Sequence, residues 1–356
     1  MKKITVLYPI DRNKGNPFVD ELAGIMSEDF EVVMDRKEFW KNGKNTNFNY
    51  DIIHLHWPES LFDWRTISNE DLLKLEKILI YWQKESKILL TRHNSHPHKN
   101  WLYKDEKGSA LYKLISKYSH AIVHFGRFSV DEYKKRYNGM DFLLRQSHEI
   151  IPHGLYTSYI NTIDMKEARE NLKLPDNKQV ILTFGAIRNK KESRLIKNAI
   201  MDIPIKNKII LAPRWNFSSR PLLKKGQELF YKIHPYYKLE SRFVLNKEIQ
   251  IYLNACDIVF IPRLENLNSG LVSLAFSFKK VVVGINKGLI GEILKETDNS
   301  TFDNNDPKNV AAAVMKGLDL SKKGMGLVNY QYGKKYWNSK IVSDKYKKVY
   351  FGLLNM

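Results

Sequence analysis

The sequence predicts an α/β protein built from two doubly wound domains with parallel sheets. Short apolar strands alternate with segments of helical periodicity along the whole chain, and this alternation implies a parallel sheet covered on both faces. The pattern is interrupted between about Gly154 and Asp164 and then repeats. With 356 residues the chain is long for one domain and comfortable for two.

The N-terminal half contains apolar runs that read as buried strands, each followed by a helix or a polar loop. We predict strands at residues 3–8, 30–34, 51–56, 86–91 and 121–124, and helices at residues 18–26, 72–84, 111–118 and around 127–136. Residues 150–154 close this half. The ligands of such sheets bind beyond the carboxyl ends of the strands, so the loops that follow these strands are the candidate site.

The C-terminal half shows the same alternation of strands and helices. We predict strands at residues 179–183, 209–212, 242–244, 257–262 and 281–283, and helices at residues 165–172, 247–255, 270–278, 307–318 and 337–352. Two domains of this kind that face each other would place a cleft between their strand ends.

Composition limits the classes of protein that need to be considered. A hydrophobic content of 43% and a charged content of 27% are those of a soluble globular protein. We expect no signal peptide at the start of the sequence, because its apolar run is too short, and no apolar stretch approaches the roughly 18 residues that span a bilayer. The single cysteine, Cys256, fits a reducing compartment. The net charge of +19 predicts an acidic partner, either a nucleic acid, an anionic membrane face or a phosphorylated ligand.

Two strand–turn–helix segments in the C-terminal half predict a diphosphate site. In the first, an apolar strand runs into Gly185, Arg188 and Lys191; in the second, Asn268, Ser269 and Gly270 open a helix. Helix N-termini present unpaired N–H groups that suit phosphate, and the basic side chains add full positive charges. For either segment alone, an ordinary loop with a solvated basic residue is the alternative.

Five motifs in this order resemble the two-domain GT-B glycosyltransferases, and in particular glycosyltransferase family four. They are Asp51–Glu59 (DIIHLHWPE), Thr91–Asn94 (TRHN), Ile151–Gly154 (IPHG), Phe184–Arg188 (FGAIR) with Lys191, and Asn268–Gly270 (NSG) followed by Ala275–Phe278 (AFSF). The resemblance covers most of the chain. It implies two Rossmann-like domains, at residues 1–158 for the acceptor and 159–335 for the nucleotide-sugar donor, with a helix at 336–356 that crosses back onto the first domain.

The resemblance also implies a metal-independent sugar transfer without a cofactor, from a nucleotide sugar to a glycan or lipid-linked acceptor. The net charge of +19 and the lack of a spanning stretch predict a cytoplasmic enzyme that touches the anionic inner face of a membrane, and a nucleic acid is not expected as a partner. The predicted donor-binding residues are Gly185, Arg188, Lys191, Arg214, Glu265, Asn268, Ser269 and Gly270. The predicted acceptor-binding residues are Asn16, His56, Trp57 and His153.

One departure from the family pattern bears on the mechanism. Many family-four enzymes carry two glutamates seven residues apart around this glycine; here Glu265 is present, but the later position falls near Leu274 or Ala275. The motif from Ser269 to Phe278 also resembles a bacterial subgroup of β-mannosyl or related transferases, which invert the anomeric configuration. This favours inversion over retention.

An inverting transfer needs a general base from the N-terminal side. Glu59, Asp11 and His93 are the predicted catalytic residues, because each lies just beyond a predicted strand. A transition-metal site at His54 and His56 is not favoured, because the remaining spacing fits no zinc pattern. The alternative functions are a nucleotide-sugar epimerase of the same fold and a basic nucleic-acid-binding protein.

Overall fold

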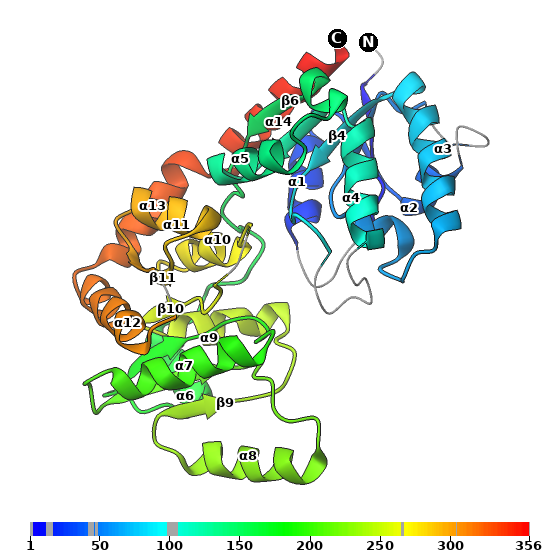
Figure 1. Cartoon of the computed structure of the whole chain (residues 1–356). Helices are drawn as coiled ribbons and strands as arrows, with labels where there is room; N and C mark the ends of the chain where they lie inside the picture. Colours follow the sequence, from blue (N-terminus) through cyan, green and yellow to red (C-terminus); the bar gives the residue numbers. More distant parts are fainter. Residues whose placement is uncertain are drawn as a thin grey trace. The chain divides into compact units, whose positions relative to one another are not determined.

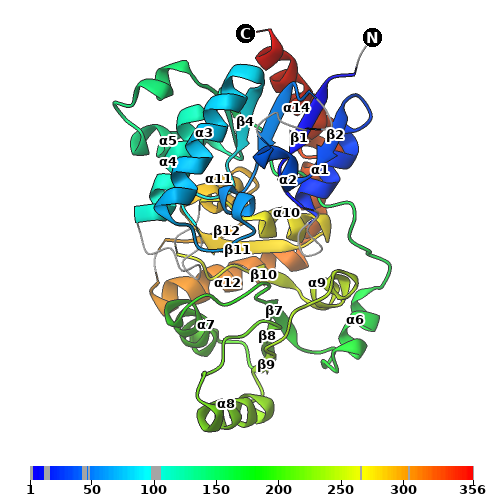
Figure 2. The same cartoon turned by 90° about the vertical axis from the view of Figure 1, so that its right-hand side faces the viewer.

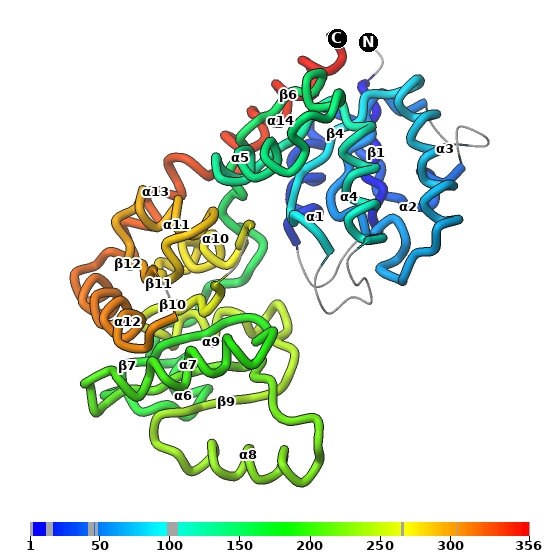
Figure 3. The backbone as a smooth tube through the Cα atoms, viewed as in Figure 1, coloured from blue at the N-terminus to red at the C-terminus, as the bar shows by residue number. Residues whose placement is uncertain are grey.

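The chain folds into two compact units. The N-terminal unit comprises Met1–His153 together with Asn338–Met356, and the C-terminal unit comprises Gly154–Trp337. The structure, a computed structural model, describes residues 3–11, 17–41, 46, 49–97, 106–264, 267–303 and 305–355. Both ends of the described chain belong to the N-terminal unit (Figure 3).

The described part of the N-terminal unit contains a six-stranded parallel sheet in the order β2-β1-β3-β4-β5-β6. Its strands are β1 (Thr5–Tyr8), β2 (Glu31–Met34), β3 (Ile52–Leu55), β4 (Lys87–Thr91), β5 (Ala121–His124) and β6 (Ser147–Ile150). Its helices are α1 (Phe18–Met26), α2 (Arg36–Trp40), α3 (Asn69–Glu85), α4 (Glu106–Tyr118), α5 (Arg127–Arg136) and α14 (Ser339–Leu354), with short 3₁₀ turns at Pro58–Phe62 and Asp141–Arg145. Helix α1 packs with α14, and α3 packs with α4 (Figure 1).

The C-terminal unit repeats this architecture, with its described strands in the order β12-β11-β10-β7-β8-β9 (Figure 2). The strands are β7 (Gln179–Leu182), β8 (Lys208–Ala212), β9 (Tyr237–Leu239), β10 (Ile258–Phe260), β11 (Val281–Ile285) and β12 (Ser300–Phe302). The helices are α6 (Met165–Asn171), α7 (Lys190–Asp202), α8 (Pro221–Ile233), α9 (Ile249–Ala255), α10 (Gly270–Ser277), α11 (Gly288–Glu296), α12 (Pro307–Lys322) and α13 (Met325–Tyr336), with a 3₁₀ turn at Asn246–Glu248.

Alternate residues of the C-terminal strands belong to different hydrophobic clusters. In β7, Val180 and Leu182 belong to one cluster and Ile181 to the other. Because successive side chains of a strand point to opposite faces, the sheet has a buried core on each face. The parallel, doubly covered sheets expected from the sequence are therefore confirmed.

One predicted strand is wrong. Residues 242–244 form no strand, and the edge strand is β9, which pairs in parallel with β8. Arg242 instead binds Glu240, Glu248 and the hydroxyl of Tyr252 through its guanidinium group. The sequence pattern also did not predict α2, α8, α11, α13, β6 and β12.

Helix α14 is joined to the N-terminal sheet by buried tyrosines. The hydroxyl of Tyr350 lies 2.7 Å from Nδ1 of His54 and 2.8 Å from the hydroxyl of Tyr8. Nε2 of His54 lies 2.8 Å from Oγ1 of Thr91, which in turn lies 3.2 Å from the hydroxyl of Tyr346. The last helix of the chain thus supplies hydrogen bonds to polar groups that the first half buries.

Replacement of Tyr350 by phenylalanine tests this connection. The variant leaves the buried ring nitrogen of His54 and the hydroxyl of Tyr8 each short of one partner, so we expect a loss of about 1–3 kcal/mol in stability. Urea denaturation of Tyr350→Phe and wild type measures it. The control is Tyr336→Phe, because Tyr336 is 45% exposed and water can replace the hydrogen bonds of its hydroxyl group. Equal denaturation midpoints for the two variants would contradict the expectation.

Candidate functional site

The strand order of the N-terminal sheet places a topological switch point between β1 and β3. From β1 the chain continues to β2 on one side, and from β3 it continues to β4, β5 and β6 on the other side. Ligands of open α/β sheets bind at such points, beyond the carboxyl ends of the strands. The loops that follow β1 and β3 carry Asp11, His56, Trp57 and Glu59. Four of the predicted residues therefore lie on the two loops that border this position.

Two histidines and a tryptophan form a stacked group at this edge of the sheet. Nδ1 of His56 lies 3.1 Å from Nε2 of His93, and the indole of Trp57 stacks on the imidazole of His93 with a centroid distance of 4.0 Å. The ring of Phe18, at the start of α1, packs against His93 at 5.1 Å and against His153 at 4.6 Å. The structure thus brings together the three predicted residues His56, Trp57 and His93, and Phe18 joins His153 to them.

Burial keeps these histidines uncharged. Desolvation lowers the pKa of His56 to about 3, and it lowers the pKa of His93 well below its usual range, with the charge of His56 as a second cause. In a pair of neutral imidazoles, one ring nitrogen donates and the other accepts. Nε2 of His56 is buried and has no hydrogen-bond partner within the described residues. That nitrogen is suited to a hydroxyl group of a ligand.

Glu59 lies in the 3₁₀ turn at Pro58–Phe62 and is 1% exposed. The hydroxyl of Tyr112, on α4, lies 3.1 Å from each carboxylate oxygen of Glu59. Burial raises the pKa of Glu59 to about 7, against the opposing effect of its hydrogen bonds. A carboxyl group with this pKa exchanges its proton near neutral pH, as a general base should.

Asp11 is placed differently from the other two predicted catalytic residues. Its side chain is 57% exposed, and its carboxylate pairs with the guanidinium of Arg36 at 3.2 Å. Asn16 and Glu265, which the sequence analysis assigned to the acceptor and the donor, lie outside the described residues.

The C-terminal sheet has its switch point between β7 and β10. The loop after β7 contains Gly185, whose φ of +85° lies in the left-handed region that favours glycine. Arg188 and Lys191 follow and are exposed, and the side chain of Asn189 caps α7 by accepting from the backbone N–H of Glu192 at 2.9 Å. The turn predicted from the sequence therefore borders the switch point.

Arg263, which the sequence analysis did not select, lies on the loop after β10. A Cβ atom on Gly185 would come within 3.5 Å of its Nη2, so its guanidinium lies against the glycine turn. Its Nη1 lies 3.8 Å from Oε1 of Glu192, a buried carboxylate whose Oε2 accepts from the backbone N–H of Arg188 at 2.8 Å. Burial, followed by the charge of Arg188, lowers the pKa of Arg263 to about 10. Strand order was the missing information, because only the adjacency of β7 and β10 brings Arg263 to Gly185.

The remaining donor residues lie on neighbouring loops. The carbonyl of Arg214 accepts from the backbone N–H of Ile187 at 3.2 Å, and its guanidinium lies 5.3 Å from the ring centre of Phe243. Ser269 caps α10, which begins at Gly270, and Asn268 precedes it on the loop after β10. Helix α10 thus presents its N-terminus on the same loop as Arg263.

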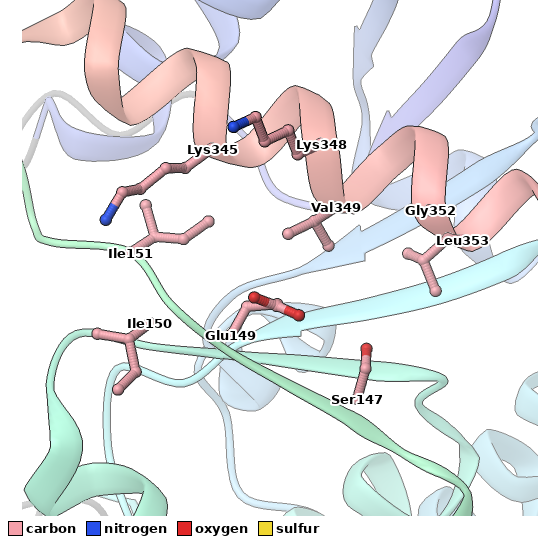
Figure 4. Close-up of a pocket in the computed structure, with 9 residues that line it drawn as sticks. All are labelled: Ser147, Glu149, Ile150, Ile151, Lys345, Lys348, Val349, Gly352 and Leu353. Atoms are coloured by element: carbon pink, nitrogen blue, oxygen red, sulfur yellow. The ribbon is translucent and has the colours of Figure 1, made fainter.

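A groove of about 320 Å³ lies between β6 and α14 in the N-terminal unit (Figure 4). The strand contributes Glu149 and Ile150 to its lining, and the helix contributes Lys345, Lys348 and Val349. None of the residues predicted from the sequence to form the site lines this groove.

The known proteins that resemble this chain in sequence and in structure include sugar-transferring enzymes. No family model matches the sequence. The chain is 23% identical over 290 residues to a GDP-mannose:glycolipid 4-beta-D-mannosyltransferase of Xanthomonas campestris pv. campestris, a match that covers 79% of this chain and 73% of that protein. A second such mannosyltransferase, from another strain of that organism, is 22% identical over the same length.

Among solved structures, the sucrose-phosphate synthase of Thermosynechococcus elongatus superimposes with a TM-score of 0.71 at 13% identity and covers 99% of this chain and 100% of that one. HepE of Anabaena, solved in complex with UDP-glucose, gives a TM-score of 0.65 at 11% identity over 97% of this chain and 99% of that one. Membership in family four stays a prediction. The chain has the fold of the GT-B glycosyltransferases, as its sequence motifs indicated.

Proposed function

We propose that the protein transfers a sugar from a nucleoside-diphosphate sugar to a hydroxyl of a glycan or lipid-linked acceptor. The observation that carries the proposal is the cationic edge of the C-terminal sheet, where Arg188 and the buried Arg263 flank the turn at Gly185. Two guanidinium groups beside a glycine turn and a helix N-terminus form the kind of site that binds a diphosphate. The proposal includes charge neutralisation by these side chains in place of a metal ion.

The relatives guide the choice of donor. The curated relatives are named for transfer of mannose from GDP-mannose to a glycolipid, and HepE was solved with UDP-glucose. GDP-mannose carries its sugar in the α configuration, so a β-mannoside product requires inversion. We therefore propose an inverting transfer, with GDP and UDP as the first nucleotides to test.

The N-terminal unit is the proposed acceptor side. Trp57 is half-buried and presents an aromatic surface beside His93, and Nε2 of His56 offers a hydrogen-bonding atom. Aromatic faces and a few fixed polar atoms are typical of binding sites for small polar molecules. Glu59 is the proposed base, because its pKa near 7 suits the task. We further propose that the enzyme acts at the inner face of the membrane.

The donor assignment predicts a loss of affinity in the arginine variants. A hydrogen bond to a charged group contributes about 1.5–3 kcal/mol, so Arg188→Ala and Arg263→Met should each bind the preferred nucleoside diphosphate roughly tenfold to a hundredfold more weakly. Lys191→Ala should also bind the nucleoside diphosphate more weakly, because it removes a positive charge. Isothermal titration calorimetry with GDP and UDP measures these effects.

The matched control is Arg194→Ala, which removes the same charge from an exposed position on α7. It should bind as wild type does, and wild-type affinity in Arg188→Ala and Arg263→Met together would refute the phosphate assignment.

The base assignment predicts a change in the pH profile. The base must be deprotonated to act, so kcat should rise as the pH increases through about 7, the pKa of Glu59. Glu59→Gln should reduce kcat by about 10²–10⁴-fold and remove this rise, with nucleotide affinity unchanged. Initial rates from pH 5 to 9 provide the measurement.

Glu76→Gln serves as the control for the base, because Glu76 also accepts a hydrogen bond from a tyrosine of α4, Tyr118 at 2.8 Å, but is partly exposed on α3. Turnover of Glu59→Gln within a few-fold of wild type, or a product that keeps the anomeric configuration of the donor, would exclude Glu59 from this role.

A further inference from the structure

Helix α8 carries an apolar face that the described residues leave exposed. Leu222 is 85% exposed and Ile233 is 75% exposed, and Leu223, Leu229 and Phe230 are between 53% and 63% exposed. With 3.6 residues per turn these five side chains fall on one side of the helix, and Tyr231, the residue of α8 that is buried, falls on the other. The helix thus packs on its own unit through the side of Tyr231 and presents its apolar side outward.

Lysines accompany this apolar face. Lys224, Lys225 and Lys232 are exposed on α8, and Glu228 is the acidic residue among them. Lys225 and Lys232 are seven residues apart, so they share one margin of the apolar face. An amphipathic helix with exposed leucine and phenylalanine on one side and lysines beside them has the composition of a helix that lies in a membrane interface.

No other described helix gathers large exposed apolar side chains in this way. Elsewhere in the described chain a helix carries at most three of them, as α13 does with Leu327, Val328 and Tyr336. Scattered exposed residues of this kind are normal on soluble proteins. Among the described residues, none of the helices is both long enough and apolar enough to cross a bilayer. A helix that lies on the surface of the membrane is compatible with that finding.

We propose that α8 docks the C-terminal unit on an anionic lipid surface, with its apolar face inserted among the acyl chains and its lysines at the headgroups. The lysines and the net charge of +19 favour a lipid surface over a neutral protein partner. The choice of a membrane rests in part on the proposed transfer to a lipid-linked acceptor. A contact through the basic run Lys134–Arg136 of α5 would be purely electrostatic. In the proposed docking of α8, burial of the apolar side chains provides most of the binding energy.

Co-sedimentation tests the proposal, with phosphatidylcholine vesicles that contain or lack phosphatidylglycerol. Wild type should bind the anionic vesicles. The double variant Leu222→Ser and Ile233→Ser should bind at least tenfold more weakly, since each buried aliphatic side chain contributes about 1.5–3 kcal/mol. The control pair Leu73→Ser and Met201→Ser changes two residues that are 62% and 61% exposed on other helices, and it should bind as wild type does.

Charge variants separate the two basic surfaces. Lys225→Glu with Lys232→Glu should abolish the preference for anionic vesicles, and Lys134→Glu with Lys135→Glu on α5 should keep it. The reverse pattern would overturn the proposal, as would equal binding of the leucine–isoleucine variant and wild type. Absence of wild-type binding to anionic vesicles would overturn it too.

Two further measurements distinguish the remaining outcomes. Nucleoside diphosphate affinity, measured in the same samples, should be unchanged in all α8 variants, so a failure of membrane docking leaves the proposed sugar transfer intact. Light scattering gives the oligomeric state. A wild-type dimer that Leu222→Ser with Ile233→Ser converts to a monomer, without loss of vesicle binding, would identify the face as a contact between copies of the chain and overturn the lipid assignment.

Discussion

The carboxyl ends of the two parallel sheets bury polar side chains, and each of these groups must replace the hydrogen bonds that it loses from water. In the N-terminal unit the replacement comes from distant parts of the chain. Tyr350, the last tyrosine of the sequence, serves both His54 and Tyr8. This dependence makes α14 part of the N-terminal unit, which is complete only when the end of the chain has folded onto it.

The two units meet this requirement in different ways. The N-terminal edge contains imidazoles and aromatic rings, and its histidines are uncharged because burial lowers their pKa. The C-terminal edge retains charge: Arg263 stays cationic near neutral pH and shares one carboxylate, Glu192, with the backbone of Arg188. In the proposed function, the stacked group of His56, Trp57 and His93 faces the neutral acceptor, and the turn at Gly185 with Arg263 faces the anionic diphosphate.

The sequence was sufficient for the class of fold because apolar runs and helical periodicity are local properties. Gly185 could be identified for the same reason, since a glycine after a strand indicates a turn. The ion pair of Arg263 with Glu192 could not be predicted, because it depends on which strands are neighbours. The error at residues 242–244 has a related cause: a short edge strand is selected by its pairing with β8, and local β propensity does not reveal that pairing.

The proposed transfer needs opposite electrostatic environments for its two reacting groups. Negative charge grows on the departing nucleoside diphosphate, and fixed guanidinium groups stabilise that charge without reorganisation. The attacking hydroxyl must lose a proton to a carboxylate that is not already paired with a cation. Asp11 is paired with Arg36 and exposed, whereas Glu59 is buried beside Tyr112 and holds its proton up to about pH 7. Burial makes the carboxylate of Glu59 a stronger base than an ordinary glutamate, because desolvation raises its proton affinity.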